Sequence, residues 1–224
     1  MTANGANVRA APRIGILGGT FDPVHRGHLA SALDTANAFA LGRVLLVLSA
    51  RPPHKDESAH ASIEDRLAML RLAVAGEPLL EASDMEARRP GASYTVDTLR
   101  EVGRTHPGSE LFLIVGIDAW REVDTWHRPE DLLGLASVIV TSRPGAEFSR
   151  TDVIPPVAAR SGCCYDSSIS SYVHRSGHRL TAHQIAGVDV SSTDVRRRIR
   201  DKLPFEHLLP SPVAHYIRQH GLYA

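Results

Sequence analysis

The chain has 224 residues, of which 43% are hydrophobic, so it is long enough and apolar enough to bury a sizeable core. Lys plus Arg and Asp plus Glu number 25 each, which excludes a global field that would attract nucleic acid or an anionic membrane. The chain has no apolar stretch long enough to cross a bilayer, and its two cysteines, Cys163 and Cys164, are sequence neighbours. Together these features predict a cytoplasmic protein.

Short apolar runs and helical patterns alternate along the chain after a small, polar N-terminal segment. Residues 1–12 predict a flexible tail. Strands are predicted at residues 13–17, 44–48, 79–82, 111–115 and 138–141. Helices are predicted at residues 29–40, 63–74, 94–102, 119–123 and 129–135, the second of them capped by Ser62. This alternation predicts an α/β protein with a doubly wound, mainly parallel sheet.

The last third of the chain is less regular. Residues 146–178 show little periodicity and predict loops, with a short edge strand at residues 153–154 as an option. A β-type run at residues 188–190 and helices at residues 193–199 and 213–220 follow. Residues 13–224 are therefore expected to form a single domain that ends in helices.

A glycine-rich segment, "GGTFDPVHRGHL", follows the first predicted strand and matches neither a dinucleotide-binding fingerprint nor a Walker loop. His25 and His28 are three residues apart, so both face one side of the first helical turn, near its positive end. Gly27 between them leaves backbone N–H groups open to an anion. Alternatively, Asp22 caps the helix and the histidines are surface groups. Spacing alone leaves both interpretations open.

A second polar cluster, "VSSTDVR", opens a helix late in the chain. Ser191, Ser192 and Thr193 offer hydroxyl and N–H groups, and Arg196 lies one turn further on the same face. These groups suit a second anion site. Taken alone, the cluster is equally a serine-capped helix with a solvated arginine face. No histidine or cysteine spacing indicates a zinc site.

Taken together, the two segments resemble the nucleotidyltransferase superfamily, which carries T/H-x-G-H after its first strand and an I-S-S-T-x-x-R-like motif late in the chain. The order of "GGTFDPVHRGHL", "PPHK", "SYTVDTL", "GIDAW", "TW", "SRPG" and "VSSTDVR" is similar to that of the bacterial nicotinate-nucleotide adenylyltransferase family. The resemblance implies a Rossmann-like fold and adenylyl transfer from ATP to nicotinic acid mononucleotide in NAD biosynthesis. It also implies Mg²⁺ carried by ATP, with no metal held by the protein. Neither nucleic acid nor a membrane is an expected partner, and a homo-oligomer is left open.

The resemblance also implies roles for individual residues. The implied catalytic residues are His25, His28 and Arg196. The implied ATP-binding residues are Gly18, Gly19, Thr20, Phe21, Gly116, Asp118, Ser191, Ser192 and Thr193. The implied mononucleotide-binding residues are Lys55, Ser93, Tyr94, Thr95 and Trp126. In this assignment the two histidines, with Lys55 and Arg196, are cations that hold phosphate. Asp118 accepts hydrogen bonds from the ribose, and Trp126 stacks on the pyridine ring.

Each assignment has an alternative. Asp118 could cap a helix, Tyr94 could be a core residue, and Trp126 could be a structural aromatic at a loop–helix junction. Among related families, phosphopantetheine adenylyltransferases carry Thr at the position of His25, and cytidylyltransferases lack the "SYT" and tryptophan elements. Class I aminoacyl-tRNA synthetases need a K-M-S-K-S loop. A non-catalytic nucleotide-binding protein would not need both histidines and Arg196. The choice between nicotinate and nicotinamide mononucleotide stays open.

Overall fold

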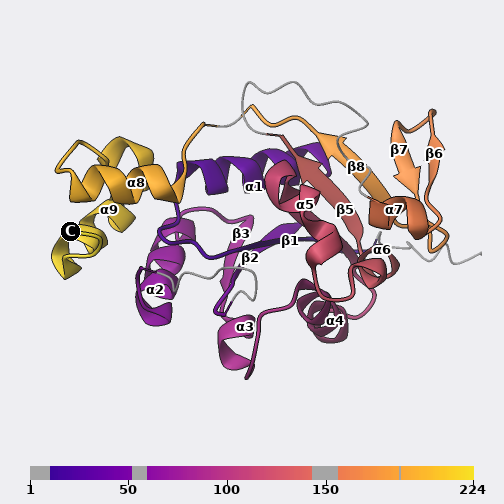
Figure 1. The fold of residues 1–224 in the computed structure, drawn as a ribbon, viewed down its shortest axis with the longest axis horizontal. Helices are drawn as coiled ribbons and strands as arrows, with labels where there is room; N and C mark the ends of the chain where they lie inside the picture. The colour runs from indigo at the N-terminus through magenta and orange to yellow at the C-terminus, as the bar shows by residue number, and fades with distance from the viewer. Residues whose placement is uncertain (1–10, 52–59, 143–155, 187) are drawn as a thin grey trace, which may run out of the picture.

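The computed structural model describes residues 11–51, 60–142, 156–186 and 188–224. Within these ranges the chain folds around one sheet with helices on both faces (Figure 1). The strands are β1 (Arg13–Gly19), β2 (Arg43–Leu48), β3 (Leu80–Ser83), β4 (Glu110–Gly116), β5 (Ser137–Thr141), β6 (Cys164–Asp166), β7 (Ser171–Val173) and β8 (Arg179–His183). Their order across the sheet is β3-β2-β1-β4-β5-β8-β7-β6.

Neighbouring strands run parallel from β3 to β8, which confirms the predicted doubly wound, mainly parallel sheet. From β1 the chain moves outward through β2 and β3, and it then crosses to the other side of β1 at β4. In such a sheet, ligands bind beyond the carboxyl ends of the strands at the point where the order reverses. The fold therefore places the expected site between the ends of β1 and β4.

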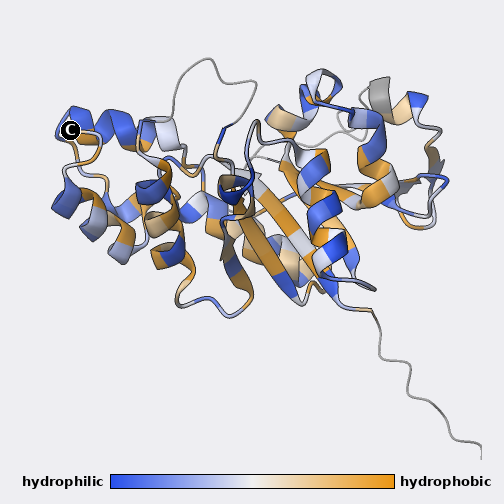
Figure 2. Ribbon diagram, turned by 90° about the horizontal axis from the view of Figure 1, so that it is seen from below, coloured by the Kyte–Doolittle hydropathy of each residue, from blue (hydrophilic) through white to orange (hydrophobic). Residues whose placement is uncertain are grey.

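The helices complete two cores, one on each face of the sheet. They are α1 (Arg26–Ala38), α2 (Ile63–Val74), α3 (Met85–Arg88), α4 (Thr95–Thr105), α5 (Ile117–Arg121), α6 (Leu132–Leu135), α7 (Pro156–Arg160), α8 (Ser192–Arg200) and α9 (Ser211–His220), with 3₁₀ turns η1 (Val123–Thr125), η2 (Pro129–Asp131) and η4 (Glu206–Leu208). Alternate residues of a strand point to opposite faces. Leu17 and Leu46 pack with α1, α2 and α9 in the first core. Ile16 and Leu45 pack with α4, α5 and α6 in the second core. Figure 2 shows the apolar strands between helices whose outer faces are polar.

Local signals account for several helix boundaries. Ser62 caps α2 as predicted, because its hydroxyl accepts from the backbone N–H of Asp65 at 3.0 Å. Helix α1 begins at Arg26 with His25 as its N-cap residue, so the alternative in which Asp22 caps this helix is wrong.

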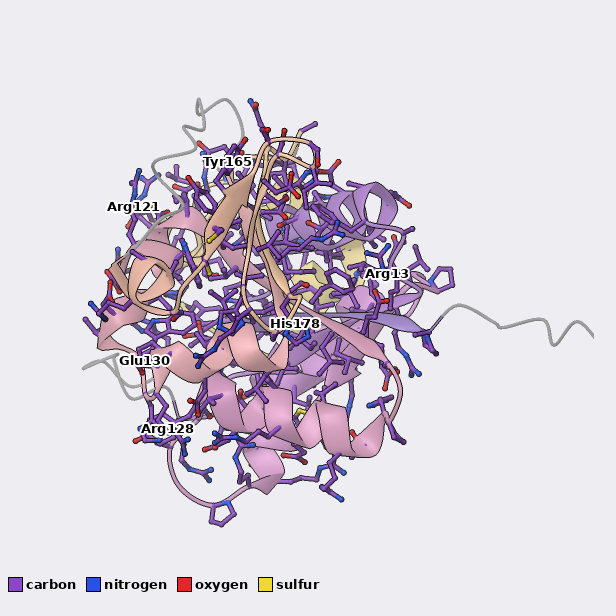
Figure 3. The ribbon with its side chains drawn as sticks, turned by 90° about the vertical axis from the view of Figure 1, so that its right-hand side faces the viewer. Arg13, Arg121, Arg128, Glu130, Tyr165 and His178 are labelled. Carbon is purple, nitrogen blue, oxygen red and sulfur yellow. The ribbon has the colours of Figure 1, made fainter. Side chains whose placement is uncertain are left out.

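The least regular part of the sequence holds more structure than predicted. Residues 156–173 include α7 and the antiparallel hairpin β6–β7, where only loops were expected, and the sixth parallel strand, β8, follows just beyond the predicted loop region. The β6 and β7 strands are too short to show alternation, and β8 carries charged and polar residues at its ends. Figure 3 looks onto this end of the molecule and labels Tyr165 on β6 and His178 ahead of β8.

The β-type run at residues 188–190 forms no strand in the described chain, so that prediction is wrong. Val188 is 51% exposed because the chain has left the sheet there to reach α8. The predicted edge strand at residues 153–154 and most of the predicted N-terminal tail lie outside the described residues.

Candidate active site

The glycine-rich segment leaves the carboxyl end of β1 beside two other strands. Gly18 and Gly19 still pair with Val47 and Leu48 of β2, and the backbone N–H of Ser49 donates to the carbonyl of Gly19 at 2.8 Å. On the other side β1 pairs with β4. The segment that follows Gly19 therefore starts at the reversal point of the sheet.

His25 and His28 face the same side of the first turn of α1. Their rings are stacked, with centroids 3.7 Å apart and planes inclined by 23°. The backbone N–H of His25 donates to Nδ1 of His28 at 3.2 Å. Because that backbone group can only donate, Nδ1 of His28 is the acceptor, which leaves Nε2 as the donor atom of the ring. His28 is thus prepared to donate a hydrogen bond from Nε2.

His25 is buried, and burial lowers its pKa to about 4. Its ring is therefore neutral at pH 7, and its Nδ1 atom has no hydrogen-bond partner among the described residues. The prediction that His25 is a cation is wrong, because the stacked rings and the packed loop exclude the water that would solvate an imidazolium. A neutral His25 therefore stacks on His28 next to a helix N-terminus.

Gly27 serves a packing role that its sequence position did not reveal. A Cβ atom on Gly27 would lie 3.0 Å from the carbonyl oxygen of Val188 and 3.1 Å from Nδ1 of His25. The missing side chain therefore lets α1 accept both the ring of His25 and the segment that leads into α8. Gly27 brings the two motifs together, in addition to opening the helix N-terminus.

The N-terminus of α8 lies against the loop that precedes His25. Ser191 caps α8 by accepting from the backbone N–H of Asp194 at 3.1 Å. Ser192 donates its hydroxyl to the carbonyl of Pro23 at 2.9 Å. Arg196 donates Nη1 to the carbonyl of Asp22 at 2.7 Å. The structure therefore brings the two predicted anion-binding motifs into direct contact.

Arg196 differs from the arginines beside it. Arg197 and Arg198 both form ion pairs with Asp194, as expected of a solvated face. In the described chain Arg196 contacts a backbone carbonyl and the hydroxyl of Thr193, and no carboxylate pairs with it. Its positive charge is thus not cancelled by an ion pair, and only part of its five N–H donors is used.

Two residues that the sequence did not indicate, Arg66 and Tyr223, form hydrogen bonds with the glycine-rich loop. Arg66 of α2 is only 2% exposed, and it donates to the carbonyls of Thr20 and Ser49 at 2.9 Å each, and to that of Ala50 at 3.4 Å. Tyr223, near the end of the chain, donates its hydroxyl to the carboxylate of Asp22 at 2.7 Å. Periodicity places Arg66 on a helix, but no local signal predicts that it turns inward.

Phe21 is a core residue. Its ring is 1% exposed, belongs to the first core and meets the ring of His28 edge-on at 5.0 Å. Of the ATP-binding role predicted for Phe21, only its backbone N–H remains as a candidate contact. Its side chain instead packs against the ring of His28.

Gly116 and Asp118 lie at the carboxyl end of β4, beside the glycines of β1. Leu17 pairs with Ile114, so Gly116 stands two residues beyond the paired positions, next to the end of β1. Gly116, not Asp118, is the N-cap residue of α5, so the alternative in which Asp118 caps this helix is wrong. Asp118 is exposed, and no atom comes within 4 Å of a Cβ built on Gly116.

The described residues predicted to bind the mononucleotide lie at the start of α4 and in the segment after η1. Ser93 exchanges hydrogen bonds with Arg51, and Tyr94 is the N-cap residue of α4, which begins at Thr95. The ring of Tyr94 stacks on His127 with centroids 4.3 Å apart. His127 was not predicted, although it follows Trp126 directly in the chain.

Tyr94 and Trp126 are both half-buried and pack against the second core. Their structural alternatives therefore hold in part, and each still exposes some of its ring. Lys55 lies outside the described residues.

A hollow of about 460 Å³ lies between α3 and α4, lined by four arginines among other residues. Arg89 pairs there with Glu101, and Arg100 pairs with Asp97. This surface is an ion-pair network on the second-core face, separate from the loop at His25.

Among the described residues, no group of three or more His, Cys, Asp or Glu side chains is placed to hold a metal ion. No described helix is long and apolar enough to cross a membrane.

Comparison with known proteins agrees with this geometry. The family described as "Cytidylyltransferase-like" matches residues 16–198. A protein of Geobacter metallireducens named "Probable nicotinate-nucleotide adenylyltransferase" is 40% identical over 213 residues, which cover 94% of this chain and 98% of that protein. A protein of the same name from Desulfitobacterium hafniense is 38% identical over 218 residues, 97% of this chain and 99% of that protein. Plasmodium falciparum nicotinic acid mononucleotide adenylyltransferase complexed with NaAD shares the fold, with a TM-score of 0.73, 16% identity, and coverage of 95% of this chain and 97% of that one.

The doubly wound sheet, the contact between the two predicted anion-binding motifs and the family match together identify a nucleotidyltransferase of the cytidylyltransferase-like family. The similar proteins assign the chain to one family within this class, because they share one name and match nearly the whole chain. The chain belongs to the nicotinate-nucleotide adenylyltransferase family, which confirms the resemblance seen in its motifs.

Proposed function

We propose that this chain transfers the adenylyl group of ATP to nicotinic acid mononucleotide, producing nicotinic acid adenine dinucleotide and pyrophosphate in NAD biosynthesis. The 5′-phosphate of the mononucleotide attacks the α-phosphorus of ATP as the bond to pyrophosphate breaks. The contact between Arg196 and the carbonyl of Asp22 carries the proposal, because it joins the two anion-binding motifs into one site. Membership of the family supports the choice of substrates.

The attacking phosphate needs no general base. A phosphate monoester has a second pKa of roughly 6, so it is mostly dianionic at neutral pH. The rate must instead come from positioning and from stabilising the charge that moves onto pyrophosphate. In this proposal Nε2–H of His28, the exposed N–H groups at the start of α8 and the guanidinium of Arg196 hold the phosphates of ATP.

The remaining polar groups suit the other parts of the two substrates. Asp118 is exposed beside Gly116 and offers only acceptor atoms, which fits the two ribose hydroxyls of ATP. Ser93 and Thr95 lie at the start of α4, where hydroxyl and N–H groups fit the phosphate of the mononucleotide. The partly exposed rings of Tyr94 and Trp126 fit the pyridine ring.

Mg²⁺ is proposed to arrive with ATP. The groups beside His28 are N–H, hydroxyl and guanidinium donors, and the carboxylate of Asp22 is occupied by hydrogen bonds from His60, Ala61 and Tyr223. This donor set suits phosphate oxygens and not a cation. The ion would therefore be held by phosphate oxygens and water, and it would reduce the repulsion between the two anionic substrates.

The direct test is incubation of the purified protein with ATP, Mg²⁺ and nicotinic acid mononucleotide, followed by measurement of pyrophosphate and of the dinucleotide. Release of both at the same rate supports the proposal, and ATP binding without either product refutes it. Nicotinamide mononucleotide in a parallel reaction measures the preference for the carboxylate. We propose a cytoplasmic setting for this activity, to which the free thiols of Cys163 and Cys164 are suited.

A further inference from the structure

We infer that Tyr223 is a positioning residue for adenylyl transfer, because its hydroxyl holds the Asp22 carboxylate and through it the backbone that orients Arg196. The inference rests on the proposed function, since the property that it explains is the rate of the transfer step. It assigns a role to a side chain that stands 201 positions from Asp22 in the chain.

Asp22 is the point where four segments of the chain meet. Its carboxylate is 4% exposed, and it accepts from the backbone N–H groups of His60 at 2.8 Å and Ala61 at 3.2 Å, and from the hydroxyl of Tyr223 at 2.7 Å. Its main-chain carbonyl accepts from Arg196 at 2.7 Å. The side chain of Asp22 is therefore tied to the body of the protein, while its backbone holds a residue of the site.

Among the described residues, Tyr223 supplies the side-chain hydrogen-bond donor to this buried carboxylate. Burial raises the pKa of Tyr223, and its hydrogen bond to Asp22 raises it further, so the phenol stays protonated and remains a donor. A buried carboxylate that loses a donor must recover one elsewhere. The guanidinium of Arg196 already contacts the main-chain carbonyl of Asp22 at 2.7 Å, so it is the group expected to move toward the vacated oxygen.

Movement of Arg196 toward the carboxylate would take it away from the carbonyl of Asp22. It would also place a negative charge against the guanidinium that the site otherwise leaves without an ion pair. Both changes weaken its hold on the phosphates of ATP. The hydroxyl of Tyr223 thus prevents an ion pair between the Asp22 carboxylate and Arg196.

A second tyrosine of the same C-terminal region provides a matched control. Tyr216 on α9 donates its hydroxyl to the carboxylate of Asp65 at 2.9 Å, also across a long sequence separation. Asp65 lies in the first turn of α2, and its hydrogen bonds within the described chain are with Ser62 and Tyr216, not with the glycine-rich loop. Tyr216→Phe therefore removes a bond of the same chemistry without touching the site.

The experiment compares Tyr223→Phe and Tyr216→Phe with the wild type, measuring kcat, the KM values of both substrates and Tm. Tyr223→Phe is expected to lower kcat about tenfold to a hundredfold, because small displacements of a positioning group have effects of this size, and to leave the KM of nicotinic acid mononucleotide unchanged. Tyr216→Phe is expected to leave kcat unchanged. An equal kcat in Tyr223→Phe and the wild type, or equal losses in the two variants, overturns the inference.

A double mutant of Tyr223 and Arg196 distinguishes a positioning role of Tyr223 from a general structural role. In an Arg196→Ala background, Tyr223→Phe is expected to cause no further loss of kcat, because its effect passes through Arg196. Independent, multiplying losses overturn the inference.

Crystal structures of the two variants give a readout that does not depend on activity. The bond from Arg196 to the carbonyl of Asp22 should be lost in Tyr223→Phe and kept in Tyr216→Phe. Its survival in both variants overturns the inference even if the wild type fails to release pyrophosphate, an outcome that would refute only the proposed function.

Discussion

The guanidinium of Arg196 is held by the main-chain carbonyl of Asp22, 174 positions earlier in the chain. A carbonyl orients an arginine without neutralising it, whereas a carboxylate would do both. The neighbouring Arg197 and Arg198 show the contrast, because both pair with Asp194. The backbone at Asp22, in the glycine-rich segment, therefore orients the positive charge of Arg196 without neutralising it.

His28→Ala should leave the protein folded and lower turnover by about two to three orders of magnitude. The variant loses the Nε2 donor proposed to hold phosphate, and losses of one such donor have this magnitude. Pyrophosphate release under saturating substrates measures the effect, and circular dichroism checks the fold. His215→Ala removes an exposed histidine of α9 and serves as the control. Near-wild-type turnover of His28→Ala would contradict the role given to this residue.

Gly27→Ala should lower turnover about tenfold with little change in stability. Alanine favours the helix by about 1 kcal/mol, but its Cβ would press on the Val188 carbonyl and on the His25 ring. Gly134→Ala is the matched control, because a Cβ there meets no atom within 4 Å. It should raise stability slightly and leave turnover unchanged. If both variants keep full turnover, the contact between α1 and the segment leading into α8 does not matter for the reaction.

Arg66→Met should lower the free energy of unfolding by about 3 kcal/mol or more. It leaves the buried carbonyls of Thr20, Ser49 and Ala50 without a donor, and each lost partner costs about 1–3 kcal/mol. Urea denaturation measures the change. Arg71→Met on the same helix removes only a surface ion pair with Asp84 and should cost at most about 1 kcal/mol. Equal losses of unfolding free energy in the two variants would show that the buried hydrogen bonds of Arg66 stabilise the protein no more than a surface ion pair does.

His25 should make the folded state sensitive to acid. Burial lowers its pKa from 6.5 to about 4, so between these pH values the unfolded chain binds more protons than the folded one. Stability therefore falls as the pH falls from 6.5 toward 4, and His25 alone accounts for a loss of about 3 kcal/mol. Above pH 6.5 it has no such effect.

The measurement for His25 is the free energy of unfolding of the wild type and of His25→Asn at several pH values. The variant keeps a residue that is favoured at helix N-caps and lacks a group that titrates in this range. The difference in unfolding free energy between the two proteins should change between pH 6.5 and about pH 4 and be constant above pH 6.5. Parallel curves would show that His25 titrates normally in the folded state.

The strands that build the site were predictable because each is a short apolar run followed by a turn. That pattern placed β1, β2 and β4 correctly, and with them the carboxyl end of β1 from which the glycine-rich segment starts. It missed β8, whose ends are polar, and the three-residue strands β6 and β7, which are too short for any period to appear.

The chemical state of the site was less predictable than its location. The spacing of His25 and His28 predicted their shared face, and the stacked rings confirm it. The spacing could not predict that His25 is neutral, because the lowered pKa follows from burial of the ring, which the residue spacing does not reveal. The role of Asp22 depends on Arg196 and Tyr223. Contacts of this range leave no local pattern.

The two bonds that converge on Asp22 have a consequence for how the chain folds. They close loops of 174 and 201 positions, whose entropic cost is recovered only after most of the sheet has formed. We therefore expect the loop around Asp22 to become ordered late in folding, so that a partly folded chain lacks the proposed site. A nucleotide that binds there selects completely folded molecules, and at a hundred times its Kd it would stabilise them by about 2.7 kcal/mol. The ATP level of a cell would then influence how long this protein resists proteolysis.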